Sequence, residues 1–412
     1  MKLAVATLVA VSDQNPCTTG YQCALIPWCY SATRLQQLIE QSTPHSLSLY
    51  VLMPGSDYSQ LYTRTHVAPG KRCLLNEDTE FSDLRNCPHA GLVSLDPQLT
   101  KLIDAHKARV IKSGVMSYSP QYIRRMTHTL HKWKLLSMTR EHALDAILFA
   151  DVDVEVCPTE VCHSLAGRRL VSDEWNARVA ALVAESRTNG SEFVVLGAGD
   201  VTTPFNAGLF WVFPSALTRR VYHQGLALLR SPWNFSHGFG RLGTPRELWQ
   251  ADRASNVHSK FFRGWDAIDG GDLDQGLFLA ALHAKRKLLR LRAWKRASKH
   301  KAVHYVTGPR KPWFRALYYK AIVPNATLEE CESNQHEHRM RYFYLNSFKT
   351  VRSGPADLAE HDAPTECSLA FQTARAELEE FENYSTCCAS RHGKPCARMY
   401  GQRGGHILLN VF

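Results

Sequence analysis

The sequence predicts an α/β protein with a mostly parallel sheet, and three observations support this class. Short apolar runs rich in β-branched residues alternate with longer helical stretches, which is typical of strand–helix–strand units. Apolar residues make up 44% of the 412 residues, enough for a sizeable core. The 24 Gly and 19 Pro are ordinary numbers for this length, which excludes a disordered or collagen-like chain.

The expected strands are apolar runs that end at turn or polar residues. In chain order they are residues 3–11, 47–53, 146–150, 193–196 and 209–213. The expected helices lie between or beside them, at residues 32–40, 98–106, 122–137, 175–186 and 216–230. No run approaches the roughly 18 apolar residues that a membrane-spanning helix needs.

The first apolar run, residues 3–11, follows Lys2 and has two interpretations. It resembles the apolar core of a signal peptide, but a cleavage site near Ser12 would make such a peptide too short. A short apolar run rich in Val also suits a buried strand. We therefore expect the first strand of the sheet here.

The strand–helix alternation ends near residue 321. We expect residues 1–321 to form one large domain and residues 322–412 to form a small appendage. Within the appendage, residues 370–382 have the pattern of an acidic helix. Four cysteines surround this helix and predict disulfide stapling, although their spacing does not select among the three pairings. They are Cys367, Cys387, Cys388 and Cys396.

Cysteines and sequons bear on the compartment. Twelve cysteines and four N-glycosylation sequons slightly favour the Golgi or secretory lumen, whereas the missing signal peptide favours the cytoplasm. The sequons begin at Asn189, Asn234, Asn325 and Asn383. The compartment therefore stays open. Separately, Cys157 and Cys162 are expected to be packed or disulfide-bonded rather than bound to metal.

The net charge of +11 indicates an anionic partner. Residues 283–301 are dense in Lys and Arg and contain four large apolar side chains, so a helix with a buried side and a basic outer side is one interpretation. Such a helix would contact an anionic acceptor or a membrane surface. A nucleic-acid partner is disfavoured, because no aromatic–basic pattern of a known module is present.

Four polar segments carry candidate chemistry. Asp151-Val-Asp153 leaves an apolar strand, where ligands of parallel sheets bind, and its carboxylates suit Mn2+ or Mg2+. Residues 204–208 (PFNAG) precede the next apolar run and suit a pocket wall. Residues 269–277 (DGGDLDQGL) place carboxylates and an amide after a glycine turn. Residues 304–313 (HYVTGPRKPW) offer an imidazole, a glycine and a lysine that suits a phosphate.

Each segment alone also has a plain structural interpretation: a solvated strand end, a turn, a helix cap, or a loop that closes on the core. Taken together and in this order, LFADVDVEV, PFNAGLFWVFPS, LDQGLF and HYVTGPRKPW resemble the motifs of glycosyltransferase family 8. The resemblance covers roughly residues 2–320. It implies a GT-A-type, Rossmann-like nucleotide-diphospho-sugar transferase domain that acts with retention.

The resemblance also implies site residues. The metal ligands would be Asp151, Asp153 and His304. The diphosphate contacts would be Gly308 and Lys311, and the sugar contacts would be Asn206 and Gly208. The residues nearest the reacting carbon would be Asp274 and Gln275, with Asp272 competing for the carboxylate role. The contacts to the nucleotide base would be Thr7, Leu8 and Val9.

The implied activity is transfer of a hexosyl unit from a nucleotide sugar, expected to be a UDP-sugar, to a hydroxyl of a glycan, polysaccharide or protein. Mn2+ would be the cofactor, with Mg2+ as the alternative. Three departures favour a catalytically impaired sugar-nucleotide- or glycan-binding protein as the competing interpretation. Thr129 replaces a basic residue for which Lys132, Arg125 or Arg124 could substitute, Leu279 replaces an Asn, and the segment after His304 is one residue longer.

Overall fold

The structure is a computed structural model. It describes residues 1–9, 16–53, 97–112, 127–162, 164–188, 193–198, 205–231, 233–234, 236–239, 244, 265, 271, 273–283, 288–292, 300–304 and 407–412.

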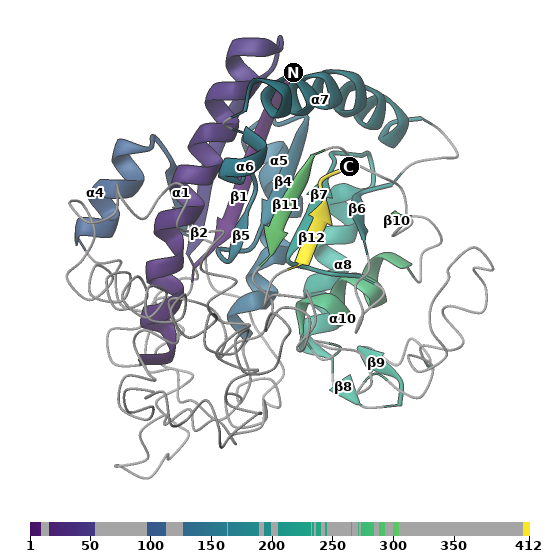
Figure 1. The fold of residues 1–412 in the computed structure, drawn as a ribbon. Coiled ribbons are helices and arrows are strands. Elements are labelled where there is room, and N and C mark those ends of the chain that lie inside the picture. The colour runs from purple at the N-terminus through teal and green to yellow at the C-terminus, as the bar shows by residue number, and fades with distance from the viewer. Residues whose placement is uncertain are drawn as a thin grey trace, which may run out of the picture.

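Seven strands form the main sheet, in the order β10-β6-β7-β4-β1-β2-β3 (Figure 1). Their bounds are β1 (Lys2–Leu8), β2 (Ser46–Met53), β3 (Arg109–Lys112), β4 (Ala146–Ala150), β6 (Val195–Ala198), β7 (Leu209–Val212) and β10 (Leu289–Arg292). β1 runs parallel to β2 and β4, β2 to β3, and β6 to β10. Only β7 is antiparallel to its neighbours. The expected α/β class with a mostly parallel sheet is confirmed.

Helical elements cover both faces of this sheet. On one face pack α1 (Pro16–Ser42), α4 (Pro97–Ala105), α6 (Thr159–Cys162) and α7 (Leu165–Ser186). On the other face pack the 3-10 helix η2 (Thr127–Lys134), α5 (Leu135–Glu141), α8 (Thr218–Arg230), α10 (Asp274–Phe278) and the π-helical turn η5 (Leu279–His283). The long α1 lies in front of β1 and β2 in Figure 1.

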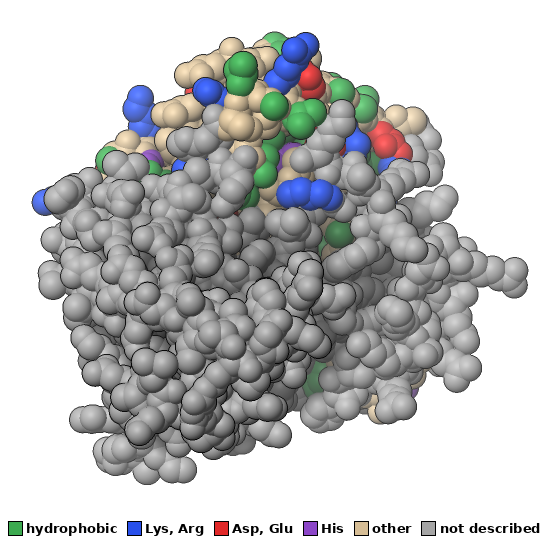
Figure 2. Space-filling model, in the orientation of Figure 1, with side chains coloured by type: hydrophobic (Ala, Val, Ile, Leu, Met, Phe, Trp, Pro, Cys, Tyr) green, Lys and Arg blue, Asp and Glu red, His purple; other side chains and the backbone are tan. Residues whose placement is uncertain are grey.

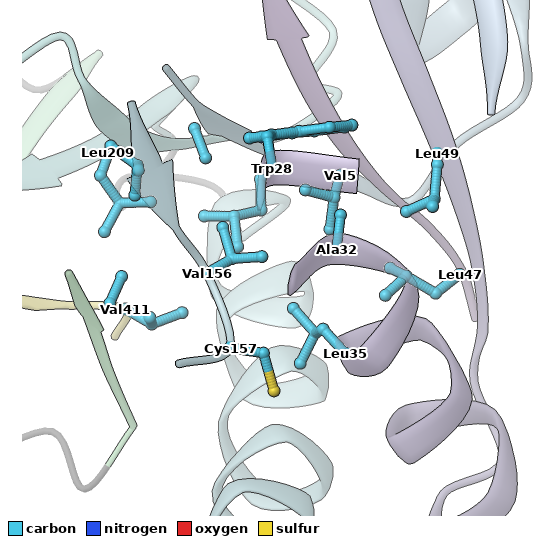
Figure 3. Packing of buried hydrophobic residues seen from close by; sticks show 14 of the residues in the cluster. Val5, Trp28, Ala32, Leu35, Leu47, Leu49, Val156, Cys157, Leu209 and Val411 are labelled. Atoms are coloured by element: carbon cyan, nitrogen blue, oxygen red, sulfur yellow. The ribbon is translucent and has the colours of Figure 1, made fainter. Parts of the chain in front are cut away.

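Burial on both faces explains why the strands are continuous apolar runs. In β1, Leu3 and Val5 belong to the core beneath α1, whereas Ala4 and Ala6 belong to the core on the opposite face. Successive side chains of a strand point to opposite faces, so a strand covered twice must be apolar at every position. Figure 3 shows Val5 on the first of these faces, in the same cluster as Trp28 and Ala32 of α1. The expected first strand is confirmed.

A second, three-stranded antiparallel sheet has the order β12-β11-β5. It contains β5 (Val154–Glu155), β11 (Lys301–His304) and β12 (Ile407–Asn410). A short hairpin of β8 (Trp233–Asn234) and β9 (Gly238–Phe239) completes the described strands. β12 comes from the segment expected to form an appendage, yet it pairs with β11. The domain boundary at residue 321 stays a prediction, because residues 305–406, including the acidic helix and the four cysteines, lie outside the described residues.

The basic stretch 283–301 differs from the expected helix where the structure describes it. Residues 289–292 form the edge strand β10, because Leu-Arg-Leu-Arg alternates with a period of two, which suits an edge strand and not a helix. Arg290 is paired with Glu185 of α7. The contact of this stretch with a membrane surface stays a prediction. On the face shown in Figure 2, basic, acidic and apolar side chains are interspersed over the described surface.

Other expectations have mixed outcomes. The helix expected at 122–137 begins as η2 and continues as α5, while residues 113–126 lie outside the described part. Cys157 and Cys162 form a disulfide, which is one of the two arrangements that the sequence predicts. Within the described ranges, no helix combines the length and apolarity needed to cross a membrane.

Candidate active site

The candidate site begins where β4 ends. Asp151 follows the fully buried residues 146–150, and its N–H donates to the Gly208 carbonyl at 2.8 Å, which ties it to the start of β7. The Val154 N–H then donates to the Asp151 carbonyl at 2.8 Å, so the chain turns tightly through Asp153 into β5. This turn lies at the carboxyl ends of β4 and β1, the edge where ligands of parallel sheets bind.

Lys132 of η2 is the centre of a buried ionic cluster. Its Nζ lies 2.8 Å from Asp151 Oδ1, 2.7 Å from Asp274 Oδ2 and 3.0 Å from the Ala207 carbonyl oxygen. It also lies 5.0 Å from the centre of the Phe149 ring. The Lys132 side chain is 4% exposed and that of Asp274 is 8% exposed. One ammonium therefore joins the segments that contain Asp151, Ala207 and Asp274.

The charges in this cluster shift the pKa values of its members. Burial alone lowers the pKa of Lys132, but the carboxylates of Asp151 and Asp274 outweigh it and raise that pKa above its ordinary value. Burial, with the neighbouring carboxylates of Asp153 and Asp274, raises the pKa of Asp151 to about 6 against the opposing effect of Lys132. Lys132 is therefore a permanently charged partner for two carboxylates that would otherwise repel each other.

Asp153 and His304 form the second part of the site. His304 Nε2 lies 3.6 Å from Asp153 Oδ1, and the two side chains are 11% and 5% exposed, respectively. The pairing of β11 with β5 brings them together, because His304 lies opposite Val154, the residue after Asp153. These two residues are far apart in the sequence, and their spacing alone could not place them side by side.

Gly208 and Asn206 lie between the two parts. The Asn206 side-chain oxygen accepts a hydrogen bond from the Gly208 N–H at 2.7 Å. A Cβ on Gly208 would lie only 2.8 Å from that oxygen and 2.8 Å from His304 Cε1. Real Cβ contacts are essentially never this short, so only glycine permits the backbone to approach the His304 ring this closely.

Asp274 and Gln275 begin α10, which packs beside η2. Gly276 allows the close approach of α10 to residue 271, because a Cβ there would lie 1.6 Å from the Gly271 carbonyl oxygen. The buried Gln275 Oε1 has no hydrogen-bond partner among the described residues. A buried amide oxygen in this position can accept a hydrogen bond from a ligand hydroxyl. Asp272, the competing carboxylate, lies outside the described residues.

Thr7, Leu8 and Val9 lie at the carboxyl end of β1, beside the strand that leads to Asp151. All three are buried, at 0%, 7% and 0% exposure. The Thr7 hydroxyl is another buried polar group without a hydrogen-bond partner in the described part of the chain. Their expected contact with a nucleotide base stays a prediction, as do the roles of Gly308 and Lys311, which lie outside the described residues.

The donor set suits a divalent cation in part. A buried carboxylate oxygen and an imidazole nitrogen face each other at Asp153 and His304, and both are ligand types of first-row metals. Both Asp151 oxygens instead lie within 2.9 Å of Lys132 Nζ. Among the described residues, no group of three His, Cys, Asp or Glu side chains is arranged to hold a metal ion. A cation here would therefore draw one Asp151 oxygen from Lys132.

The residue that the sequence left undecided is Lys132. It was one of three basic residues that could substitute at the position of Thr129, and the structure shows it between Asp151 and Asp274. Arg124 and Arg125 lie outside the described residues. A comparison with protein-family models finds no matching family, and a comparison with curated proteins finds no matching relative.

Proposed function

We propose that the chain is a retaining glycosyltransferase with a GT-A-type fold. It would move a hexosyl unit from a UDP-sugar to a hydroxyl of a glycan, polysaccharide or protein acceptor. One observation carries the proposal: Lys132 joins Asp151 of the Asp-x-Asp segment to Asp274 of the Asp-Gln-Gly segment. These are two of the four segments that resemble family 8, and the resemblance assigns them to neighbouring parts of one site.

The charges of the site support a divalent cofactor. Among the described residues, Asp151, Asp153 and Asp274 supply three carboxylates and Lys132 supplies one ammonium, so these four side chains together carry a net charge of −2. Buried charges need compensation. Mn2+, with Mg2+ as the alternative, would be held by Asp153, His304 and one oxygen of Asp151. When bound, the cation supplies Lewis-acid stabilisation of the leaving diphosphate.

The protein's own residues then orient the donor sugar. Lys132 fixes the Asp274 carboxylate by a 2.7 Å contact, so that Asp274 faces the sugar in one position. Asp274 would stabilise positive charge as it develops at the reacting carbon. The Gln275 side-chain oxygen, which lacks a partner among the described residues, would accept a hydrogen bond from a sugar hydroxyl. Lys311 would contact the diphosphate where negative charge grows.

Transfer of the sugar needs no reactant besides the donor and the acceptor. The acceptor oxygen forms a bond to the anomeric carbon on the face from which the diphosphate leaves. The bond between that carbon and the phosphate oxygen breaks, and its electron pair goes to the diphosphate. The acceptor proton passes to the leaving phosphate oxygen. Retention follows because attack and departure occur on the same face.

A donor-hydrolysis assay tests this function. Purified protein with Mn2+ is incubated with a panel of UDP-hexoses, and UDP release is measured, since a competent transferase usually leaks sugar to water. We expect release with at least one donor and none with chelator present. UDP binding without release from any donor, with or without added glycan acceptors, would favour the impaired binding protein. No binding and no release would contradict both interpretations.

A further inference from the structure

β11 contains His304 at its last residue, and it has one partner strand on each side. On one side, His304 lies opposite Val154 of β5. On the other side, it lies opposite Ile407 of β12. The β5 ladder covers two residues of β11, whereas the β12 ladder covers all four. Within the described sheet, β12 is therefore the main support of the strand that presents His304.

The residues after β12 anchor it in the core. Val411 and Phe412 are 0% and 4% exposed. The Phe412 ring stacks on Trp211 of β7, with ring centres 5.5 Å apart, and meets Trp175 of α7 edge-on at 5.6 Å. Trp211 Nε1–H donates to the Val411 carbonyl at 2.7 Å. Two indole rings, which also contact each other, therefore fix this segment.

The start of β11 is fixed by His300, which lies just before the strand. Its ring Nδ1 accepts a hydrogen bond from Trp175 Nε1 at 2.9 Å, and its Nε2 donates to the Val156 carbonyl at 2.6 Å. Its backbone N–H donates to Glu174 Oε2 at 2.7 Å, and its carbonyl accepts from the Val411 N–H at 3.3 Å. His300 thus joins α7, the end of β5 and the segment after β12.

We propose that residues 407–412 are a positioning strand for the candidate metal site, holding β11 against β5 so that His304 faces Asp153. The physical reason is that a two-residue ladder is too short to fix a strand. With β12 in place, β11 is a central strand whose ends are both bonded. The proposal concerns how His304 is placed, and its metal-binding measurements rest on the proposed function.

The register gives a matched test of this role. Because the Val411 N–H points to His300, alternation along the strand predicts that the N–H groups of residues 409 and 407 also point to β11. The N–H of residue 408 then points away. Leu409→Pro should break the ladder, whereas Leu408→Pro should leave it intact, since an edge strand tolerates proline where the N–H faces outward.

The experiment compares each proline variant of the full chain with the alanine variant at the same position, which removes the effect of losing the leucine side chain. Mn2+ affinity is measured by calorimetry. We expect Leu409→Pro to bind Mn2+ at least about tenfold more weakly than Leu409→Ala, the scale of losing support for a metal ligand. Leu408→Pro should stay within about twofold of Leu408→Ala. Equal losses in both pairs, or no loss with folded Leu409→Pro, would overturn the proposal.

A measurement on the wild-type chain decides the case in which Leu409→Pro does not fold. Coupling is reciprocal, so if docked β12 strengthens Mn2+ binding, Mn2+ must strengthen the docking of β12. Hydrogen exchange at the amides of residues 407, 409 and 411 should slow when Mn2+ is added. Amides of β1, which is central in the main sheet, serve as the reference. Unchanged exchange in β12 with Mn2+ bound would overturn the proposal.

Failure of the proposed function would be recognised separately. If the wild-type chain binds no Mn2+, the metal role is wrong, but the placement of His304 is still measurable through its imidazole nitrogen resonances. Those resonances should shift in Leu409→Pro relative to Leu409→Ala, whereas those of the buried His45 should not. Unshifted His304 resonances in a folded variant would contradict the positioning role.

Discussion

The two halves of the candidate site differ in the contacts that the described residues make there. Around Lys132, one ammonium contacts Asp151, Asp274 and the Ala207 carbonyl, all at 3.0 Å or less. At the other half, Asp153 and His304 are 3.6 Å apart, which is beyond a good hydrogen bond. The first half is an ionic cluster with short contacts, and in the second the described contact between an imidazole and a carboxylate is longer.

This difference predicts that the Lys132 half contributes mainly to folding stability and the Asp153 half mainly to cation binding. Removing the cation of a buried ionic cluster lowers the free energy of unfolding, because the remaining charges stay buried without compensation. A pair that faces a possible cation has the opposite property, since removing one carboxylate relieves repulsion when no cation is bound. Removing Lys132 from the first half should therefore lower the free energy of unfolding, whereas neutralising Asp153 in the second half should not lower it.

The largest effect is expected from Lys132→Met. The variant leaves Asp151 and Asp274 facing each other without a cation, so the free energy of unfolding should fall by about 3–5 kcal/mol, and UDP release should be lost. Urea denaturation measures the loss.

Lys134→Met is the matched control in the same helix, because Lys134 pairs with the half-exposed Glu141. Exposed pairs contribute about 1 kcal/mol or less. Similar losses in both variants would contradict the role given to Lys132.

The second effect is expected from Asp274→Asn. The amide keeps the size of the side chain but removes the charge that would stabilise the sugar in the transition state. The rate of UDP release should fall roughly 10²-fold or more, with little change in donor affinity. Asp272→Asn is the control. If Asp272→Asn is the inactive variant instead, the assignment of this segment is wrong by two residues, and if both variants are active, the carboxylate role is wrong.

Much of the fold could be predicted from the sequence because the main strands are covered on both faces. Such strands are continuous apolar runs, so β1, β2, β4 and β7 were recognisable directly. β10 differs from the expected helix because a stretch dense in Lys and Arg with scattered leucines fits both a basic helix and an alternating edge strand. β12 could not be found, since its pairing with β11 joins segments about a hundred residues apart. Its sequence contains no signal of that partner.

The candidate site shows the same limit. The motifs placed Asp151 after a strand and Asp274 at a helix start, but neither motif contains the residue that joins them. Lys132 was one of several basic residues in its region, and only its position in η2, between two strand ends, makes it the buried counterion. The pairing of His304 with Asp153 likewise depends on the β5–β11 ladder, which local sequence does not encode.

The third effect is expected from Asp153→Asn in the half of the site that contains His304. Mn2+ affinity should fall at least about tenfold, the scale of disturbing a metal site. Calorimetry measures this affinity. Without Mn2+, the free energy of unfolding should stay equal or rise, because one of three neighbouring carboxylates is neutralised. Asp173→Asn on the outer surface of α7 is the control and should change neither quantity. Lower stability without Mn2+ would show that the Asp153 carboxylate stabilises the fold even when no cation is bound.

The smallest effect concerns pH and the strand that supports His304. Burial lowers the pKa of His300 to about 4, so the native state holds this ring neutral, whereas the unfolded chain protonates it near pH 6.5. Its stabilising contribution is complete above about pH 6.5 and is lost as the pH falls toward 4, by roughly 1–2 kcal/mol at pH 5.

His300→Gln should lower stability at pH 7.5 but flatten its decline between pH 7 and pH 5 in urea titrations. His223→Gln, on the exposed side of α8, should leave that decline unchanged. If His300→Gln declines as steeply as wild type, another group governs the acid sensitivity and the neutral ring does not hold β11 in place.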